Sequence, residues 1–351
     1  MRSLDWVPTK CLQLSLWLIS SFVLAGCSAT NVSLFELSGQ TMGTTYRLTY
    51  ASSENREASL KEEVEQLLRA INQSLSPFIE SSLISRINAS RDTAQTFAID
   101  RHFEIVFQHA QYIHDLTNGA FNPALGPLIR AWGFGKDEPR TLDSTEVNDL
   151  LQFTSLEIFS FEGDDPPRLR KQKAEGELDF GAIAKGHAVD ELGALLESVG
   201  IFDYLVEIGG EVRARGSHPE NRSWRVGIEK PLEASRDLQV IVNLSDISMA
   251  TSGNYRNYYW TEGRKIVHTL NPLTGYPEDN SLLSVSVIAK NCMTADAFAT
   301  AFMVLGRDRT LEFVERNGGP DVYLISGSDE EAWETSTTDG FSRLIETETE
   351  F

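Results

Sequence analysis

An aspartate and a threonine four residues apart, Asp296 and Thr300, are the side chains in this sequence whose spacing best suits a hard cation. On a helix, both oxygens would project from the same face. Magnesium takes oxygen ligands, few of them from the protein, and completes its shell with water and substrate phosphates. The alternative is structural: Asp296 favours the positive end of a helix, and Thr300 bonds back to its own helix. On spacing alone, the structural interpretation is the stronger one.

A glycine-rich segment, LDFGAIAKGHAVD at 178–190, could bind a phosphate group. Asp179 precedes Gly181 at the start of an expected helix, and Lys185 follows shortly after. Free amides at a helix N-terminus together with a nearby lysine can hold a phosphate. Taken alone, the segment is more typical of an ordinary turn with Lys185 in solvent. No segment matches GxxxxGK[ST] or GxGxxG, so a mononucleotide-binding fold has little support.

His268 stands where an expected strand runs into a turn rich in proline and glycine, 266–277. A histidine in such a place could act as a general base, because its pKa lies close to neutral pH. Most lone histidines have no such role, and the other five have no better context. The chain contains no GxSxG and no HExxH, so nothing indicates a serine hydrolase or a zincin. Those five are His102, His109, His114, His187 and His218.

The elements that must position these residues follow from hydrophobic periodicity. Several strand-like runs follow one another without intervening helices, which predicts an α+β fold with largely antiparallel sheet and packed helices. We find no repeat and no linker, so a single domain is expected, with an acidic, solvated end from about residue 326. We expect helices over 58–75, about 183–199 and about 294–305, the last with Thr294 as N-cap, and strands over 204–208, 224–228, 239–244 and 283–289.

Composition limits the partners of this chain of 351 residues. It has 31 Lys and Arg against 51 Asp and Glu, a net charge of -20. This negative charge argues against nucleic acid as a partner, because binding to a duplex needs a basic protein surface. A ligand that carries phosphates would need local compensation from a divalent cation or from helix N-termini.

The N-terminal residues are predicted to be a signal peptide, residues 1–26. Basic residues precede an apolar run over 11–25, which is shorter than the roughly 20 residues of a membrane-spanning helix. The run ends in Leu24-Ala25-Gly26-Cys27, which resembles a bacterial lipobox, so Cys27 is the predicted lipidation site and begins the mature domain, 27–351. The alternatives are a plain secretory signal or an uncleaved anchor. Cys292 would then be the remaining thiol, buried and inert.

Nine segments between about Glu36 and Arg307 resemble the ApbE family of flavin transferases, in the same order and with similar spacing. One such motif would be weak, but nine collinear motifs argue against coincidence. They are GQTMGTTY (39–46), SPFIESSLISRIN (76–88), GAFNPALGPLIRAWGFG (119–135), LDFGAIAKGHAVD (178–190), VEIGGEVRARG (206–216), WRVGIEKP (224–231), ATSGNYRNYY (250–259), HTLNPLTGYP (268–277) and SVSVIAKNCMTADAFATAFMVLG (284–306).

The resemblance implies one ApbE-like domain with magnesium-dependent FAD:protein FMN transferase activity. Such an enzyme splits FAD, attaches FMN to a threonine or serine hydroxyl of a target protein, and releases AMP. The implied partner is a flavin-carrying subunit of a redox complex, such as a sodium-pumping NADH:quinone reductase. The implied location is the periplasmic side of the inner membrane, through a lipid anchor, although Ser28 after the cysteine would favour the outer membrane in some bacteria.

The resemblance also assigns residues by motif. The cation would be held by Asp296, Thr300 and the backbone carbonyl of Ala182, and we nominate His268 as the general base. Phe78 stands where the family often has tyrosine, and Asn271 replaces a frequent aspartate. The residues implied for the FAD site are Met42, Phe78, Ala120, Phe121, Asn122, Asp179, Lys185 and Leu270.

Two other activities are compatible with the same residues. A magnesium-dependent FAD pyrophosphatase would use water in place of the protein hydroxyl and would release free FMN and AMP. A non-catalytic lipoprotein would bind and deliver intact FAD. The sequence does not separate these three readings, because the same cation and pyrophosphate site serves each of them.

Overall fold

The computed structural model describes residues 32–346, except 136–137, 164–166, 234–235, 256–257, 262 and 328–331. The predicted signal peptide, 1–26, and the predicted lipidation site, Cys27, lie outside the described residues. Within the described part, no helix has the length and apolar character needed to cross a bilayer.

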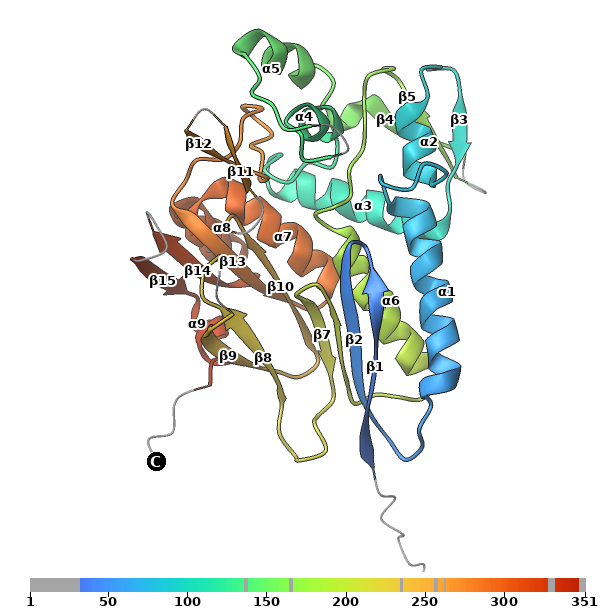
Figure 1. Ribbon diagram of the computed structural model, residues 1–351, viewed down its shortest axis with the longest axis vertical. Helices are drawn as coiled ribbons and strands as arrows, with labels where there is room; N and C mark the ends of the chain where they lie inside the picture. Colours follow the sequence, from blue (N-terminus) through green and yellow to red (C-terminus); the bar gives the residue numbers. More distant parts are fainter. Residues whose placement is uncertain are drawn as a thin grey trace, which may run out of the picture. The chain divides into compact units, whose positions relative to one another are not determined.

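The centre of the domain is an eight-stranded sheet in which every neighbouring pair of strands is antiparallel (Figure 1). This confirms the expected α+β fold with largely antiparallel sheet. In spatial order the strands are β1 (Ser33–Thr41), β2 (Thr44–Ser52), β6 (Tyr204–Ile208), β7 (Glu211–Arg215), β10 (Ile247–Gly253), β13 (Leu282–Ala289), β14 (Asp321–Gly327) and β15 (Trp333–Thr337).

Three small antiparallel sheets surround the large one. They consist of β11 (Tyr258–Thr261) with β12 (Arg264–Val267), β8 (Trp224–Glu229) with β9 (Leu238–Leu244), and β3 (Thr96–Ala98), β5 (Arg168–Lys171) and β4 (Phe159–Glu162) in that order.

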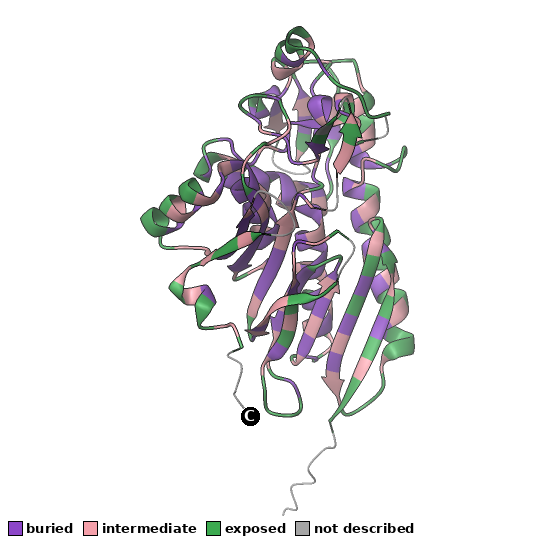
Figure 2. Cartoon of the chain, turned by 60° about the vertical axis from the view of Figure 1, so that its left-hand side comes forward, coloured by how far each residue is buried: buried purple, intermediate pink, exposed green. Residues whose placement is uncertain are grey.

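Four long helices form a layer on one face of the large sheet (Figure 1). The helices α6 (Ala184–Ser198) and α7 (Cys292–Leu305) lie directly on the strands, while α1 (Glu57–Leu75) and α3 (Arg101–Leu116) pack against them. Figure 2 shows that the buried positions gather where these helices meet the central strands. Asp296 is the only charged residue of α7. Shorter helices are α2 (Leu83–Ala89), α4 (Gly126–Ala131), α5 (Ser144–Leu151), the 3-10 turn Leu156–Ile158, α8 (Arg307–Asn317) and α9 (Asp339–Ser342).

The predicted helices and strands are confirmed to within two residues at each end, with one difference in capping. The N-cap of α7 is Asn291, not Thr294, because the Asn291 side chain accepts the Thr294 backbone N–H at 2.8 Å. Thr294 therefore lies inside the helix, where its hydroxyl meets the His109 ring at 2.9 Å. Asparagine takes the cap because its side-chain carbonyl reaches the amide three residues ahead while its own backbone stays extended.

The segment after residue 326 has many exposed side chains, as expected, but it also forms regular structure and covers part of the core. The strand β15 pairs with β14, and the short helix α9 follows it. Phe341 is completely buried, with its ring centroid 5.6 Å from that of Tyr323. Ile345 then forms an isolated bridge with Val242 of β9. These residues help to cover the face of the large sheet opposite the helices, while the acidic residues Glu334, Asp339 and Glu346 are exposed.

Replacing Phe341 by alanine should lower the free energy of unfolding by about 3–5 kcal/mol, because the side chain fills a closed site in the second hydrophobic cluster. Urea unfolding of the purified domain measures this loss. Phe202→Ala is the matched control, since its ring is 51% exposed and its loss should cost under about 1 kcal/mol. Equal losses in the two variants would show that the C-terminal segment does not belong to the core.

Candidate functional site

Two carboxylates and one ammonium group meet in the protein interior between α6, α7 and the start of β7. Lys185 Nζ lies 2.7 Å from Glu211 Oε1 and 3.9 Å from Asp296 Oδ1. Glu211 and Asp296 are 3% and 2% exposed. The sequence nominated Lys185 and Asp296 but missed Glu211. The sequence feature that could have identified Glu211 is its place directly after Gly209-Gly210 in the family motif. Nothing in the sequence spacing, however, places this glutamate beside Lys185.

Asp296 reaches this cluster because α6 and α7 approach each other closely at Gly186. A Cβ atom at Gly186 would stand 2.5 Å from the carbonyl oxygen of Cys292, so only glycine fits there. Across this contact the Gly186 N–H donates to Asp296 Oδ2 at 2.9 Å. Ala182 precedes Ile183, the N-cap of α6, whose φ of -153° is not helical, so the Ala182 carbonyl lies outside the hydrogen-bond ladder of this helix. The Asp296 carboxylate takes up one of the N–H groups that the first turn of α6 leaves without a helical partner.

A second carboxylate, Asp190, holds the start of α7 in place. Its two oxygens accept the backbone N–H groups of Cys292 and Met293, each at 2.9 Å, and Arg213 Nη1 lies 3.1 Å from Oδ1. A carboxylate at a helix N-terminus binds the amides that lack partners within the helix. Cys292 itself is buried as expected, and burial raises the pKa of its thiol.

Burial and charge act against each other in the cluster. Burial raises the pKa of Asp296, while Lys185 and the Gly186 N–H oppose the rise. Burial also raises the pKa of Glu211 to about 7, again against the attraction of Lys185. For Lys185, burial would lower the pKa, but the two carboxylates outweigh it and raise the value. Ionised, the three groups carry a net charge of -1 in a poorly solvated site, which suits a bound cation.

The oxygen atoms around the cluster also suit a hard cation. In the part of the chain that the structure describes, Glu211 Oε2 is buried without a hydrogen-bond partner. Thr300 lies one helical turn after Asp296 on α7, and its hydroxyl is 3.3 Å from that of Ser252 on β10. Among the described residues no three His, Cys, Asp or Glu side chains form a cage, whereas the predicted set contains one carboxylate, one hydroxyl and one carbonyl. Such a sparse protein set is typical of magnesium.

Beside the start of α6 lies a hollow of about 420 Å³ that brings together two predicted FAD residues, Phe78 and Asp179. Phe78 is 66% exposed, and its ring is available for stacking. Asp179 Oδ1 accepts the Gly181 N–H at 2.6 Å, and burial raises the pKa of its carboxyl. Arg130 and Glu177 form an ion pair of 2.9 Å in the lining. The volume lies within the usual range of small-molecule sites.

Met42 occupies the two-residue turn between β1 and β2. Its φ is 50°, and that of the following Gly43 is 74°. Both positions of such a hairpin turn need positive φ, which is rare for a residue with a long side chain. Gly209 N–H donates to the Thr45 carbonyl at 3.1 Å, so this turn lies beside the β6–β7 turn that leads to Glu211. A strained methionine at that place supports a binding role.

The side chains of the predicted residues Ala120, Phe121 and Asn122 are engaged within the fold. Ala120 and Phe121 are 4% and 2% exposed. The Asn122 side chain donates to the Thr154 carbonyl at 2.9 Å and accepts the Ala124 N–H at 2.8 Å. Contact of this segment with a ligand would therefore come from its backbone.

His268 follows β12 and is half-buried, with its ring centroid 6.4 Å from that of Phe134. Its neighbour Thr269 donates to Asn254 Oδ1 at 2.7 Å, just after β10, the strand that carries Ser252 beside Thr300. This contact places the loop that carries His268 at the C-terminal end of β10. The predicted cation ligand Thr300 lies beside the same end of the strand, next to Ser252. Leu270, a predicted FAD residue, is buried with the side chains of α4.

The side chain of Asn271 stabilises the turn that follows it. Its Oδ1 accepts the N–H groups of Leu273 and Thr274 at 2.9 and 3.3 Å, and its Nδ2 donates to Glu278 at 2.8 Å. Asparagine and aspartate both form this kind of turn. The amide therefore keeps the turn without the charge.

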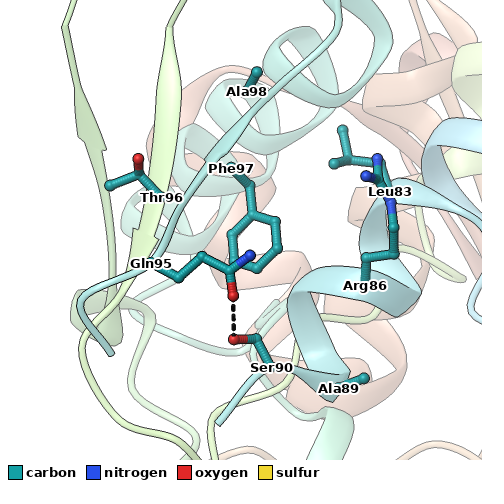
Figure 3. Close-up of a pocket in the computed structure, with 8 residues that line it drawn as sticks. All are labelled: Leu83, Arg86, Ala89, Ser90, Gln95, Thr96, Phe97 and Ala98. Carbon is teal, nitrogen blue, oxygen red and sulfur yellow. Dashed lines mark hydrogen bonds between the residues drawn. The ribbon is translucent and has the colours of Figure 1, made fainter. Parts of the chain in front are cut away.

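A further hollow, of about 650 Å³, lies between α2 and β3 (Figure 3). Ser90 and Gln95 are hydrogen-bonded across it at 2.8 Å, and Phe97 and Arg86 line it. None of the predicted site residues is in its lining. It therefore has no place in the candidate site.

Comparisons with known proteins agree with this geometry. The sequence model of the ApbE family matches residues 42–324. A curated FAD:protein FMN transferase of Vibrio cholerae is 37% identical over 89% of this chain and 94% of its own, and one of Haemophilus influenzae is 33% identical over 92% and 95%. The solved flavin transferase ApbE from Vibrio cholerae superposes with a TM-score of 0.79 at 34% identity, covering 89% of this chain and 99% of that one. The apo form of the Pseudomonas stutzeri flavinyl transferase ApbE gives 0.80 at 33%, covering 90% and 97%.

Glu211→Gln should change how the stability of the cation-free protein depends on pH. Because the folded protein holds the Glu211 proton up to about pH 7, the wild type loses stability as the pH rises from about 4.5 through 7. The variant lacks this loss, so its free energy of unfolding relative to wild type should rise by up to about 3 kcal/mol between pH 5 and pH 8. Urea unfolding in chelator measures it.

The exposed Glu157→Gln is the control and should show no such trend. A constant difference between Glu211→Gln and wild type across this range would contradict the buried, proton-holding carboxyl.

Proposed function

Because this chain belongs to the ApbE family, and its curated relatives are FAD:protein FMN transferases, we propose that it transfers FMN from FAD to a threonine or serine hydroxyl of a target protein. The reaction depends on Mg²⁺ and releases AMP. The observation that carries this proposal is the buried cluster of Lys185, Glu211 and Asp296 at the start of α6, next to the hollow that contains Phe78 and Asp179.

In this proposal Asp296, Thr300 and the carbonyl of Ala182 hold the cation. Bound there, Mg²⁺ supplies positive charge that offsets the negative charge of the FAD pyrophosphate. Glu211 keeps Lys185 in position through their 2.7 Å contact, so that the ammonium group stays at the edge of the site. The side chain of the N-cap residue Ile183 does not cap α6, and the first turn is held by other groups: the Ala184 N–H donates to the Phe180 carbonyl and the Gly186 N–H to Asp296.

The chain's own residues orient the rest of FAD. Phe78 offers an exposed aromatic face for one of the two ring systems, and stacking of this kind needs no hydroxyl. Met42 supplies an apolar contact, while Leu270, whose side chain is buried, and the 120–122 segment contribute backbone atoms. Asp179 fixes the turn before α6 through its bond to the Gly181 N–H.

His268 removes the proton from the acceptor hydroxyl. The acceptor oxygen attacks the phosphorus atom of the FMN half, and the bond from that phosphorus to the bridging oxygen breaks. The bridging oxygen leaves with AMP, and the proton passes to the His268 ring. Phe134 packs edge-on against this ring and limits its orientations.

The proposal includes a location. Cys27 carries lipid after removal of residues 1–26, and the domain works on the periplasmic side of the inner membrane. The acceptor is then a flavin-carrying subunit of a redox complex with an extracytoplasmic part, such as a sodium-pumping NADH:quinone reductase.

Asp296→Asn should abolish both FMN transfer and the dependence of the reaction on Mg²⁺, because it removes the one carboxylate of the cation set. The chain is incubated with FAD, Mg²⁺ and an acceptor domain, and flavin fluorescence is read in a denaturing gel. The exposed Asp149→Asn on α5 is the matched control and should keep wild-type transfer.

Undiminished transfer in excess chelator would contradict the role of Mg²⁺. Release of free FMN and AMP without a fluorescent acceptor would identify a pyrophosphatase instead. Intact FAD after long incubation would identify a protein that only binds it.

His268→Ala should lower the rate of transfer by about 100-fold to 10,000-fold while FAD affinity stays within about twofold, because a general base acts on the acceptor and not on FAD binding. Single-turnover transfer and flavin fluorescence titration measure the two quantities. His114→Ala, at a partly exposed histidine of α3, is the control and should change neither. Near wild-type transfer by His268→Ala would end the nomination of this residue.

A further inference from the structure

We propose that the end of the domain where β1 begins faces a lipid surface and touches it through three side chains, Val32, Leu34 and Phe202, here called the entry patch. This inference rests on the lipid anchor in the proposed function. It adds an orientation of the domain and a height of the flavin site above the membrane.

The first argument is the length of the chain between the anchor and the fold. Four residues, 28–31, separate Cys27 from Val32, where the described domain begins. Five residue steps of fully extended chain reach at most about 17 Å. A lipid on Cys27 therefore keeps the start of β1 within about that distance of the lipid headgroups. A domain held so closely at one end has few orientations open to it.

The second argument is the apolar character of that end. Val32, Leu34 and Phe202 are 48%, 41% and 51% exposed, although soluble surfaces usually bury such side chains at least in part. They lie at one end of the sheet, because Leu34 pairs with Ala51 in the β1–β2 register and the Ala51 N–H donates at 2.9 Å to the carbonyl of Asp203, next to Phe202. The start of β1 and the segment before β6 thus present apolar groups at the same end of the sheet, Phe202 on the helix side, where Arg215 also pairs with Glu197 of α6.

The surroundings of the entry patch select the kind of contact. The guanidinium carbon of Arg215 lies 5.0 Å above the Phe202 ring, a pairing that suits the boundary between lipid and water. Acidic residues nearby, such as Glu54 and Asp246, and the chain's net charge of -20 exclude a polybasic attraction to anionic lipid. The contact is therefore apolar and tether-dependent. A single lipid chain binds a membrane only marginally, so such a second contact strengthens the anchoring.

The orientation sets the height of the candidate site. Ser33 is at the start of β1, and Gly39, six residues further along, pairs with Tyr46. Tyr46 pairs with Ile208, and Ile208 pairs with Glu211. Six residues of strand span about 20 Å. With the tether, Glu211 and its cluster would stand about 20–40 Å from the lipid surface. The acceptor must then present its hydroxyl at this height, as an extracytoplasmic domain close to the membrane would.

The test uses the full-length lipidated chain on vesicles of phosphatidylethanolamine and phosphatidylglycerol that contain a lipid-borne nitroxide quencher. A fluorescent label is attached at Phe202→Cys or, as the matched control, at Asn148→Cys on α5, which Figure 1 places at the opposite end of the domain. Cys292 is buried and stays unlabelled. We expect at least threefold stronger quenching at position 202 than at position 148. The same labelled chain expressed from residue 28, without residues 1–27, should lose the quenching at position 202.

Equal quenching at the two positions, stronger quenching at position 148, or quenching at 202 that survives removal of residues 1–27 would overturn the proposal. FMN transfer is measured in detergent with the same labelled samples. Transfer without preferential quenching at 202 refutes the orientation alone, whereas preferential quenching without transfer refutes the proposed function alone.

Discussion

The close approach of α6 and α7 at Gly186 is the contact on which the candidate site depends. Because no Cβ atom separates the helices there, the Gly186 N–H reaches Asp296 and a carboxylate is held in the interior. Asp190 fixes the start of α7 from the other side through two further N–H groups. Burying Asp296 and Glu211 with Lys185 as the neighbouring cation is unfavourable in itself, as their raised pKa values show. The cost of burying these charges is offset by the burial of the many apolar side chains of α6 and α7 in the main hydrophobic core.

The large sheet relates the site to the rest of the domain. The turns at one end of its strands bring Met42 and Glu211 together, and the residues where β1 enters lie at the other end. The helices cover one face, while β8, β9 and α9 help to cover the opposite face. The charged groups of the candidate site can therefore be buried at one end without exposing the core.

The sequence predicted the long elements well because hydrophobic periodicity is a local property. It predicted the ends less well. At α7 the sequence indicated Thr294 as the cap, whereas the cap is Asn291, three residues earlier. Acidic composition suggested a solvated C-terminal end, yet Phe341 is completely buried. The strand β15 before it pairs with β14, and Phe341 packs on the face of the sheet opposite the helices.

The sequence alone determined the family, through nine motifs in one order, and with it the nomination of Asp296, Thr300, Lys185 and Asp179. Tertiary structure decided how these residues act together. Glu211 is 26 positions from Lys185 in the chain, and only the packing of β7 against α6 joins them. The position of the Asp296 carboxylate likewise depends on a bond from Gly186, a residue of another helix. Charge pairing and metal geometry depend on distances in space, which a linear sequence does not contain.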